Sequence, residues 1–220
     1  MKNSYKIFGF CAIVLFFIGI SGCSKPSPNA EKGFSYQELP VAKGSGKSGE
    51  GKTIKFRGNE LVLSGKGIHV GEPLRSVKLT KTDLSQIDLV ETKGNVRIIS
   101  IVPSLDTKVC EQQTHYLSEK NNGLDQKVTL ITISVDTPFA QDRFAKEAHI
   151  NNVLFLSDYR GGDFGKANGL LLEGPHLLTR AIMVVDGNNV IQYLQISPDL
   201  GHLPDMDSAF QKARTLAEST

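Results

Sequence analysis

A single cysteine follows a short apolar segment in a pattern that is typical of thiol chemistry. Val96–Val102 reads VRIISIV, as expected of a central buried strand, and Pro103–Cys110 (PSLDTKVC) comes directly after it. Ligands and reactive groups in open α/β sheets gather at the carboxyl ends of such strands. We therefore expect the chemistry of this protein to lie around Cys110.

The position of Cys110 favours its ionised form. Asp106 or Thr107 is a natural N-cap, so we expect a helix over 108–120 with Cys110 in its first turn. The free backbone N–H groups and the helix dipole favour a thiolate there, and the thiolate is the nucleophilic form of cysteine. Thr107 lies three residues before Cys110 on the same helical face, where its hydroxyl is expected to bond the sulfur or a bound oxygen.

The elements that must position Cys110 follow from the apolar runs and the turn residues between them. Strands are predicted over 96–102, 127–135 and 153–156, and helices over 108–120, from Pro138 to about 149, and over 205–217. Hairpins are predicted around Gly58-Asn59 and between 181–185 and 190–196. This order predicts an α/β, thioredoxin-like fold: a mixed central sheet with helices on both faces and an N-terminal β-hairpin.

The first 22 residues are predicted to be a lipoprotein signal peptide. Lys2 and Lys6 precede the uncharged apolar run Ile7–Ile20, which is too short for a comfortable transmembrane helix. The run ends in Ile20-Ser21-Gly22-Cys23, which resembles a bacterial lipobox. We therefore expect cleavage before Cys23, lipid attachment at Cys23, and a membrane anchor on the extracytoplasmic (periplasmic) side.

Residues 23–52 are predicted to be a flexible tether, followed by one folded domain over 53–220. The turn-rich Ser24–Asn29 and the Gly/Ser/Lys-rich Gly44–Lys52 have the composition of solvated linkers.

The charge balance and the histidine spacing argue against nucleic-acid binding and against a metal site. Without the two leader lysines the 25 basic residues become 23, equal to the 23 acidic ones, and no basic run predicts nucleic-acid binding. The five histidines lack ligand spacing, so we predict no metal and no other cofactor.

The segment around Cys110 is similar to a known active-site motif. Pro103-x-x-x-Thr107-x-x-Cys110 resembles that of the peroxiredoxins, and PSLDTKVC resembles the thiol peroxidase branch, the atypical two-cysteine peroxiredoxins. The resemblance continues in Ile133–Phe144 (ISVDTPFAQDRF), Asn152-Val153 and Ser157–Arg160 (SDYR), and it covers residues 53 to 220. It implies a thioredoxin-like fold, a homodimer, and a thiol-dependent peroxidase that reduces hydrogen peroxide and alkyl or lipid hydroperoxides.

The resemblance also implies residue roles. Cys110 matches the peroxidatic cysteine, which attacks one peroxide oxygen and becomes a sulfenic acid. Thr107 matches the hydroxyl that orients sulfur and peroxide, and Pro103 matches the proline that shields the pocket. Arg160 matches the arginine that stabilises the thiolate and the charge developing on the oxygens.

One position departs from the family pattern. Members usually carry a resolving cysteine just after the last Phe of the P-F-A-Q-x-R-F segment, and this chain has Ala145 there. Cys11 leaves with the leader and Cys23 is expected to be lipidated, so an intrachain resolving disulfide cannot form. An external thiol must then attack the sulfenic acid: a small thiol, a thioredoxin-like protein, or the partner subunit's Cys110.

Three other functions compete with this one. A thiol–disulfide oxidoreductase requires Cys-x-x-Cys, and Thr107 stands at the first of those positions. A cysteine hydrolase needs a histidine beside Cys110, and no local hydrolase signature is present. A non-catalytic lipoprotein on a retired peroxidase fold is the strongest alternative because of Ala145.

Overall fold

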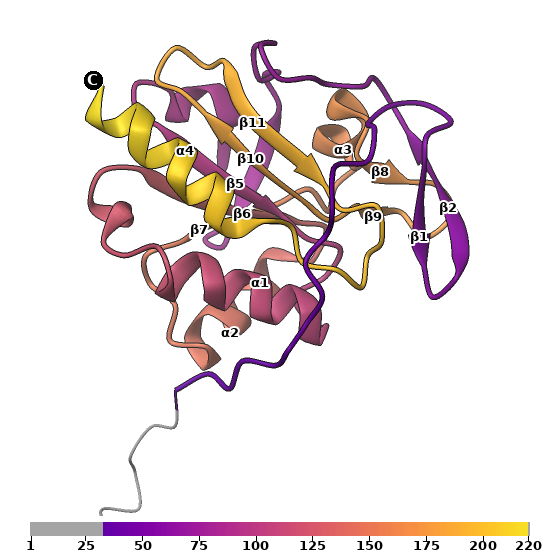
Figure 1. Ribbon diagram of the computed structural model, residues 1–220, viewed down its shortest axis with the longest axis horizontal. Coiled ribbons are helices and arrows are strands. Elements are labelled where there is room, and N and C mark those ends of the chain that lie inside the picture. Colours follow the sequence, from indigo (N-terminus) through magenta and orange to yellow (C-terminus); the bar gives the residue numbers. More distant parts are fainter. Residues whose placement is uncertain (1–32, 220) are drawn as a thin grey trace, which may run out of the picture. The chain divides into compact units, whose positions relative to one another are not determined.

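A seven-stranded mixed sheet forms the centre of the protein in this computed structural model, which describes residues 33–219 (Figure 1). The strand order is β11-β10-β5-β6-β7-β3-β4. Its strands are β3 (Lys78–Lys81), β4 (Gln86–Asp88), β5 (Arg97–Ile101), β6 (Thr129–Ser134), β7 (Leu154–Ser157), β10 (Ala181–Val185) and β11 (Ile191–Ile196).

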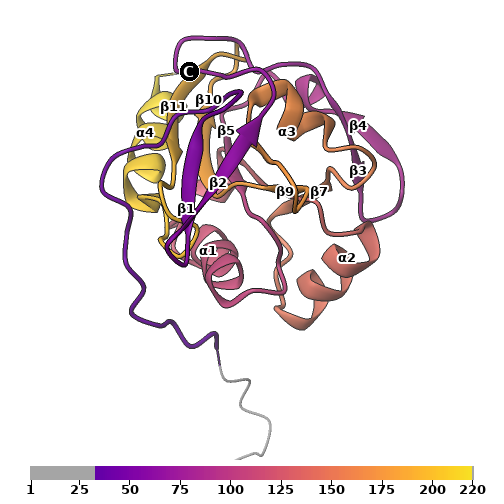
Figure 2. The ribbon, with the colours of Figure 1, turned by 90° about the vertical axis from the view of Figure 1, so that its right-hand side faces the viewer.

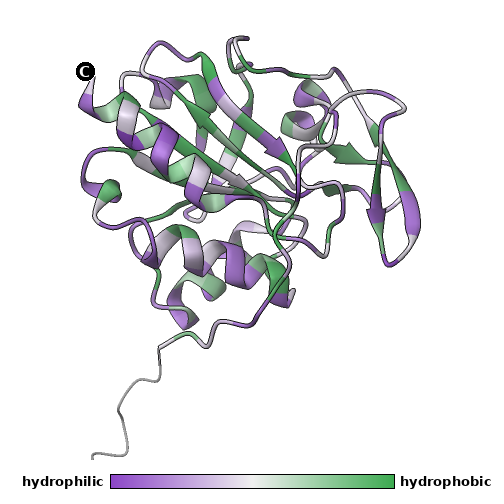
Figure 3. Ribbon diagram, in the orientation of Figure 1, coloured by the Kyte–Doolittle hydropathy of each residue, from purple (hydrophilic) through white to green (hydrophobic). Residues whose placement is uncertain are grey.

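Strand β5 lies in the middle of this sheet and leads to Cys110. It pairs in parallel with β6 and antiparallel with β10, where Ala181 lies opposite Ile101. All five residues of β5 are buried, and the central strands are the most hydrophobic part of the ribbon (Figure 3). A strand covered on both faces needs apolar side chains on both, which explains the continuous apolar run in the sequence.

Helices cover both faces of the sheet, and the two core clusters assign each helix to a face (Figure 2). Ile98 belongs to the cluster that contains Cys110 and residues of the three longer helices. Ile99, on the opposite side of the strand, packs in the cluster that contains Phe164 of the short helix α3. The helices are α1 (Lys108–Glu119), α2 (Pro138–Glu147), α3 (Asp163–Asn168, the short one) and α4 (Met206–Glu218), with 3₁₀ turns η1 (Leu89–Thr92) and η2 (Leu124–Gln126).

A smaller sheet carries the predicted N-terminal hairpin. Its order is β1-β2-β8-β9, with bounds β1 (Thr53–Phe56), β2 (Asn59–Ser64), β8 (Leu171–Leu172) and β9 (Leu177–Leu178). Phe56 pairs with Asn59, so Arg57 and Gly58 form the turn, with φ of 50° and 82°. The hairpin is confirmed, and its turn begins one residue before the predicted Gly58-Asn59. Tight two-residue hairpin turns of this kind require positive φ at both central residues.

The thioredoxin-like α/β fold is confirmed, with some additions. Helices α1, α2 and α4 begin at or within one residue of their predicted starts. The short strands β3, β4, β8 and β9 and helix α3 were not predicted, because elements this short carry too little periodicity to be recognised. No helix within residues 33–219 is long and apolar enough to cross a bilayer.

The predicted tether is wrong for its second half, because the compact unit begins at Phe34 rather than Thr53. Backbone bonds tie Ala42 N to Leu203 O and Gly46 N to Ile196 O, each at 2.8 Å. Gly49 N donates to Gly169 O at 2.9 Å, and a Cβ on Gly49 would lie 3.0 Å from the Gly67 backbone. Glycine here permits close backbone contact rather than flexibility. The signal peptide, Cys23 and the first part of the tether lie outside the described residues.

Candidate active site

The first turn of α1 holds Cys110, as predicted. Thr107 is the N-cap residue, with extended backbone angles, and the helix begins at Lys108. The Cys110 side chain is 0% exposed and packs in the core cluster between the sheet and the helices. The N–H groups of a first turn have no partner within the helix, so they can donate hydrogen bonds to an atom bound beside the sulfur.

A carboxylate from the neighbouring strand holds the loop between β5 and α1. Asp136 follows β6 and accepts hydrogen bonds from Ser104 Oγ at 2.7 Å and from Leu105 N at 2.8 Å. Because β5 and β6 run in parallel, their carboxyl ends lie side by side, and Asp136 reaches the loop directly. These two hydrogen bonds hold the backbone of the loop that leads to Cys110 in place.

A buried guanidinium contacts the sulfur. Arg180 is 2% exposed, and its Nη2 lies 3.3 Å from Cys110 Sγ. Its Nη1 donates to Gln113 Oε1 at 2.8 Å, and its Nε donates to the Leu200 carbonyl at 2.9 Å. Gln113 is in turn held by Ser100 Oγ, which accepts from its Nε2 at 2.8 Å. The planar guanidinium is therefore fixed on three sides with one N–H group directed at the sulfur.

Arg180 takes the place that was predicted for Arg160. Arg160 is exposed, and its Nε donates to the hydroxyl of the adjacent Tyr159 at 3.3 Å. It follows β7, which is two strands from β5, whereas Arg180 directly precedes β10, which is paired with β5. Neighbouring strands are about 4.8 Å apart, so the start of β10 lies within side-chain contact of the sulfur, whereas Arg160 follows a strand that is one position further away. The sequence assignment of Arg160 is corrected accordingly.

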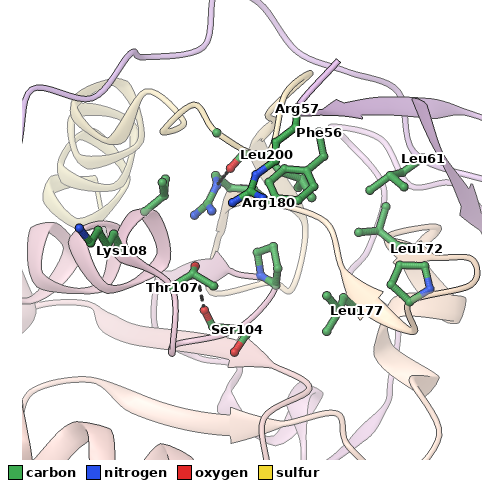
Figure 4. A pocket seen from close by; sticks show the side chains of 14 residues that line it. Phe56, Arg57, Leu61, Ser104, Thr107, Lys108, Leu172, Leu177, Arg180 and Leu200 are labelled. Atoms are coloured by element: carbon green, nitrogen blue, oxygen red, sulfur yellow. Dashed lines mark hydrogen bonds between the residues drawn. The ribbon is translucent and has the colours of Figure 1, made fainter. Parts of the chain in front are cut away.

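Pro103 and Thr107 lie at the same site as Arg180 (Figure 4). Pro103 is buried between the end of β5 and the start of α1. The Thr107 hydroxyl donates to the Ser104 carbonyl at 3.2 Å, so it bonds the loop rather than the sulfur. Both residues line one cavity with Arg180, and the Thr107 oxygen retains lone pairs that can accept a bond from a bound hydroperoxide.

The active-site cavity, as we call it below, has a volume of about 650 Å³. It lies between the β1–β2 hairpin, the first turn of α1 and the β8–β9 strands, and most of its walls are apolar. Cys110 is not among the lining residues; it is connected to the cavity through Arg180, which lines the cavity and contacts the sulfur. The lining residues are Phe56, Arg57, Leu61, Pro103, Ser104, Thr107, Lys108, Val109, Leu172, Pro175, Leu177, Arg180, Leu200 and Gly201.

Sequence reasoning missed Arg180, Gln113 and Asp136. A signal for Arg180 does exist, since a charged residue directly before the apolar strand 181–185 is costly unless it has partners. Its partners, however, are a glutamine on α1 and a carbonyl near the C-terminus, both distant in the sequence. Only the pairing of β10 with β5 brings them together.

Ala145 lies on α2 and is half-buried. It packs against the core cluster that contains Cys110, and it also borders a shallow surface hollow with Asp142 and His149. Within residues 33–219, Cys110 is the one cysteine, and it is free. The position at which the family resemblance implies a second thiol therefore packs against the same core cluster as Cys110 but carries a methyl group.

Comparisons with known proteins agree with this geometry. Residues 69–210 match the Redoxin family. A thiol peroxidase of Halalkalibacterium halodurans is 38% identical over 162 residues, which cover 74% of this chain and 97% of that protein. The thiol peroxidase of Streptococcus pneumoniae is 37% identical over 163 residues, covering 74% and 99%. Among solved structures, a peroxiredoxin-like protein from Aquifex aeolicus has a TM-score of 0.68 at 30% identity, covering 74% of this chain and 96% of that one.

Proposed function

Because the chain belongs to the thiol peroxidase branch of the redoxin family, it is a thiol peroxidase, and we propose that it reduces hydrogen peroxide and alkyl or lipid hydroperoxides through Cys110 in a one-cysteine cycle. The observation that carries the proposal is the Arg180 guanidinium, fixed 3.3 Å from a fully buried sulfur at a helix N-terminus. A protein that only bound a partner would have no need of a desolvated cation directed at a thiol.

The proposed oxidative step uses the residues around the sulfur. The Cys110 thiolate bonds to the protonated peroxide oxygen, the O–O bond breaks, and the other oxygen leaves as alkoxide or hydroxide, which then takes up a proton. Cys110 becomes a sulfenic acid. Arg180 faces the position where negative charge passes from sulfur to oxygen, and its three hydrogen bonds hold it there before the reaction begins.

The proposed resolving step uses an external thiol. Ala145 offers no sulfur, and Cys110 is the one cysteine within residues 33–219. A thiol that enters the active-site cavity attacks the sulfenic sulfur, which releases water and leaves a mixed disulfide. A second thiol then restores Cys110 and leaves as the disulfide of the two reductant molecules. Because Cys110 is fully buried, a low-molecular-weight thiol reaches it more easily than a folded protein does.

The segment that precedes β1 supports a cycle in which α1 stays folded. Phe34 stacks on His115 with ring centroids 3.9 Å apart, and Tyr36 Oη donates to Glu119 at 2.8 Å. Gln37 and Gln112 exchange two bonds, at 2.8 and 2.9 Å. Burial and the neighbouring Glu119 carboxylate raise the pKa of Tyr36 above its ordinary value, and its protonated hydroxyl is the donor to Glu119. We call residues 34–37 the α1 strap.

The location of the protein is part of the proposal. The apolar run 7–20 and the Ile20–Cys23 lipobox support a lipid anchor at Cys23 on the extracytoplasmic side of a membrane. Both features lie outside the described residues. An anchor would place the active site beside lipid hydroperoxides. The homodimer implied by the family resemblance stays a prediction.

The test is peroxide consumption by the full chain with a small thiol as reductant. Cys110→Ser should abolish turnover, because the hydroxyl is not ionised at neutral pH, while the two side chains differ by one atom. The matched control is the double variant Cys11→Ser with Cys23→Ser, which leaves Cys110 as the sole thiol and should keep its turnover. Peroxidase activity that survives in Cys110→Ser, or disappears in the control, would refute the assignment of Cys110.

A further inference from the structure

Asp136 connects the ends of three neighbouring strands, although it does not line the active-site cavity. Strands β5, β6 and β7 pair in parallel, so their carboxyl ends lie side by side. The Asp136 carboxylate accepts from Ser104 Oγ at 2.7 Å and from Leu105 N at 2.8 Å, in the loop that follows β5. Its backbone carbonyl accepts from the hydroxyl of Ser157, the last residue of β7. Asp136 therefore links the end of β7 to the loop that carries the active-site motif.

That loop leads by further hydrogen bonds to the first turn of α1. The Ser104 carbonyl accepts from Thr107 N at 3.3 Å and from Thr107 Oγ1 at 3.2 Å, the second of which is the dashed line in Figure 4. The Thr107 carbonyl then accepts the first helical bond, from Glu111 N at 2.9 Å. Ser104 and Thr107 both line the active-site cavity. A displacement of Ser104 is therefore transmitted to the Thr107 hydroxyl and to the start of the helix that holds Cys110.

The other polar contacts of the loop are longer. Asp106 N donates to Ser104 Oγ at 3.4 Å, and Arg143 contacts the exposed Asp106 carboxylate at 3.5 Å, where an ion pair contributes little. Hydrogen bonds to a carboxylate are about twice as strong as those between neutral groups. Leu105 is 3% exposed, so its peptide N–H needs an acceptor within the protein, and the loop must shift to find one if Asp136 is removed.

We propose that Asp136 is a positioning residue of the peroxidase reaction: its carboxylate holds the loop so that the Thr107 hydroxyl and the first-turn N–H groups meet the hydroperoxide beside Cys110. Asp136 acts through Ser104 and Leu105 rather than on the sulfur itself, and the oxidative step is the one already given. The inference rests on the proposed role of Cys110. Because a misplacement of about 1 Å can lower a rate by about 100-fold, the rate should respond even where the fold survives.

The test is a single turnover of the reduced full chain with hydrogen peroxide, normalised to the folded fraction. Asp136→Ala removes both acceptors, and we expect oxidation of Cys110 to slow by about 10-fold to 100-fold. Asp136→Asn should recover most of the rate, because its amide oxygen can accept from Leu105 N while its amide nitrogen donates to Ser104 Oγ. A hydroxyl can reverse its role in this way, since it is both donor and acceptor.

Asp142→Ala is the matched control. Asp142 is a carboxylate on the surface of α2 that pairs with Lys146, so its loss changes the net charge as much as Asp136→Ala does. Its rate should remain within about twofold of wild type. If Asp136→Ala does not fold, Ser104→Ala breaks one of the two bonds to the carboxylate and takes its place, with an expected loss of about threefold to tenfold.

A double-mutant cycle with Thr107→Val distinguishes positioning from a merely structural role. If Asp136 acts by placing the Thr107 hydroxyl, the loss in the double variant should be smaller than the product of the two single losses, whereas independent sites give the full product. A folded Asp136→Ala protein that reacts at the wild-type rate, an Asp136→Asn protein no faster than Asp136→Ala, or a full product in the cycle would overturn the inference. Turnover that survives in Cys110→Ser would instead refute the proposed function on which it rests.

Discussion

Replacing Arg180 by methionine removes the cation that contacts the Cys110 sulfur. Methionine keeps an unbranched side chain of similar length, so most of the packing survives. The substitution also leaves the Gln113 Oε1 and the Leu200 carbonyl without their guanidinium partner. Each unpaired buried acceptor costs about 1–3 kcal/mol, so the free energy of unfolding must be measured alongside activity.

The size of the expected effect follows from the 3.3 Å contact between Arg180 Nη2 and Cys110 Sγ. At an effective dielectric constant of about 20, a charge pair at this separation gains roughly 5 kcal/mol, and the desolvation of both groups offsets part of it. Loss of one preorganised donor from an anion-stabilising site commonly lowers turnover by about 100-fold to 1,000-fold. We therefore expect oxidation of Cys110 by hydrogen peroxide to slow by about 100-fold or more in Arg180→Met.

The assay is a single turnover, in which reduced protein is mixed with hydrogen peroxide and sulfenic acid formation is followed in time. Because no reductant takes part, the rate reports the oxidative step alone. Ultraviolet absorbance of the thiolate, recorded against pH, shows separately whether less of the sulfur is ionised in the variant. Arg180→Lys should fall between wild type and Arg180→Met, since it keeps the charge but cannot form three directed bonds.

Arg160→Met is the matched control, because it removes an exposed guanidinium that bonds only the adjacent Tyr159 hydroxyl. Its rate should remain within about twofold of wild type, as expected of a surface substitution. A folded Arg180→Met protein that reacts at the wild-type rate, or a large loss in Arg160→Met, would show that the buried guanidinium does not stabilise the reacting sulfur.

Two further variants test the resolving step and the α1 strap. In Ala145→Cys we expect peroxide to produce a disulfide between positions 110 and 145, with a two-hydrogen mass loss and less overoxidation to sulfinic acid. That bond requires Cα atoms within about 7 Å, and the two positions lie on different helices, so we expect the first turn of α1 to unwind. Continued accumulation of sulfinic acid would mean that the two sulfurs cannot meet. In Phe34→Ala, loss of the stacking on His115 should increase alkylation of the buried Cys110 in the native protein by about twofold to tenfold. The exposed Phe139 on α2 provides the control: Phe139→Ala should leave alkylation unchanged, and equal rates in both variants would contradict a role for the strap.

The position and the local environment of Cys110 could be predicted from the sequence. An apolar run marks the buried strand, Pro103 ends it, and Thr107 begins the helix, so the thiol falls in a first helical turn. All of these signals act between residues close in the sequence, where sterics, capping and burial determine the backbone. The same local signals located α2, α4 and the β10–β11 hairpin.

The identity of the cation at the sulfur could not be predicted in this way. Arg160 and Arg180 both lie beside the end of an apolar strand, and sequence distance does not say which strand is the neighbour of β5. The structure decides it, because Ala181 pairs with Ile101 and this register brings Arg180 to the carboxyl end of β5. Strand order depends on how the whole chain packs.

The N-terminal segment shows the same division between sequence and tertiary structure. The sequence by itself determined a fold with Cys110 at its reactive end, and it indicated a Gly/Ser-rich stretch between the leader and that fold. Only the tertiary structure decided that this stretch packs, since Gly49 meets the backbones of Gly67 and Gly169, and Ser48 bonds Ile68. A missing side chain permits both free rotation and close contact between backbones. Which of the two occurs depends on whether a segment that is distant in the sequence lies close in space, and the composition of the stretch does not determine that.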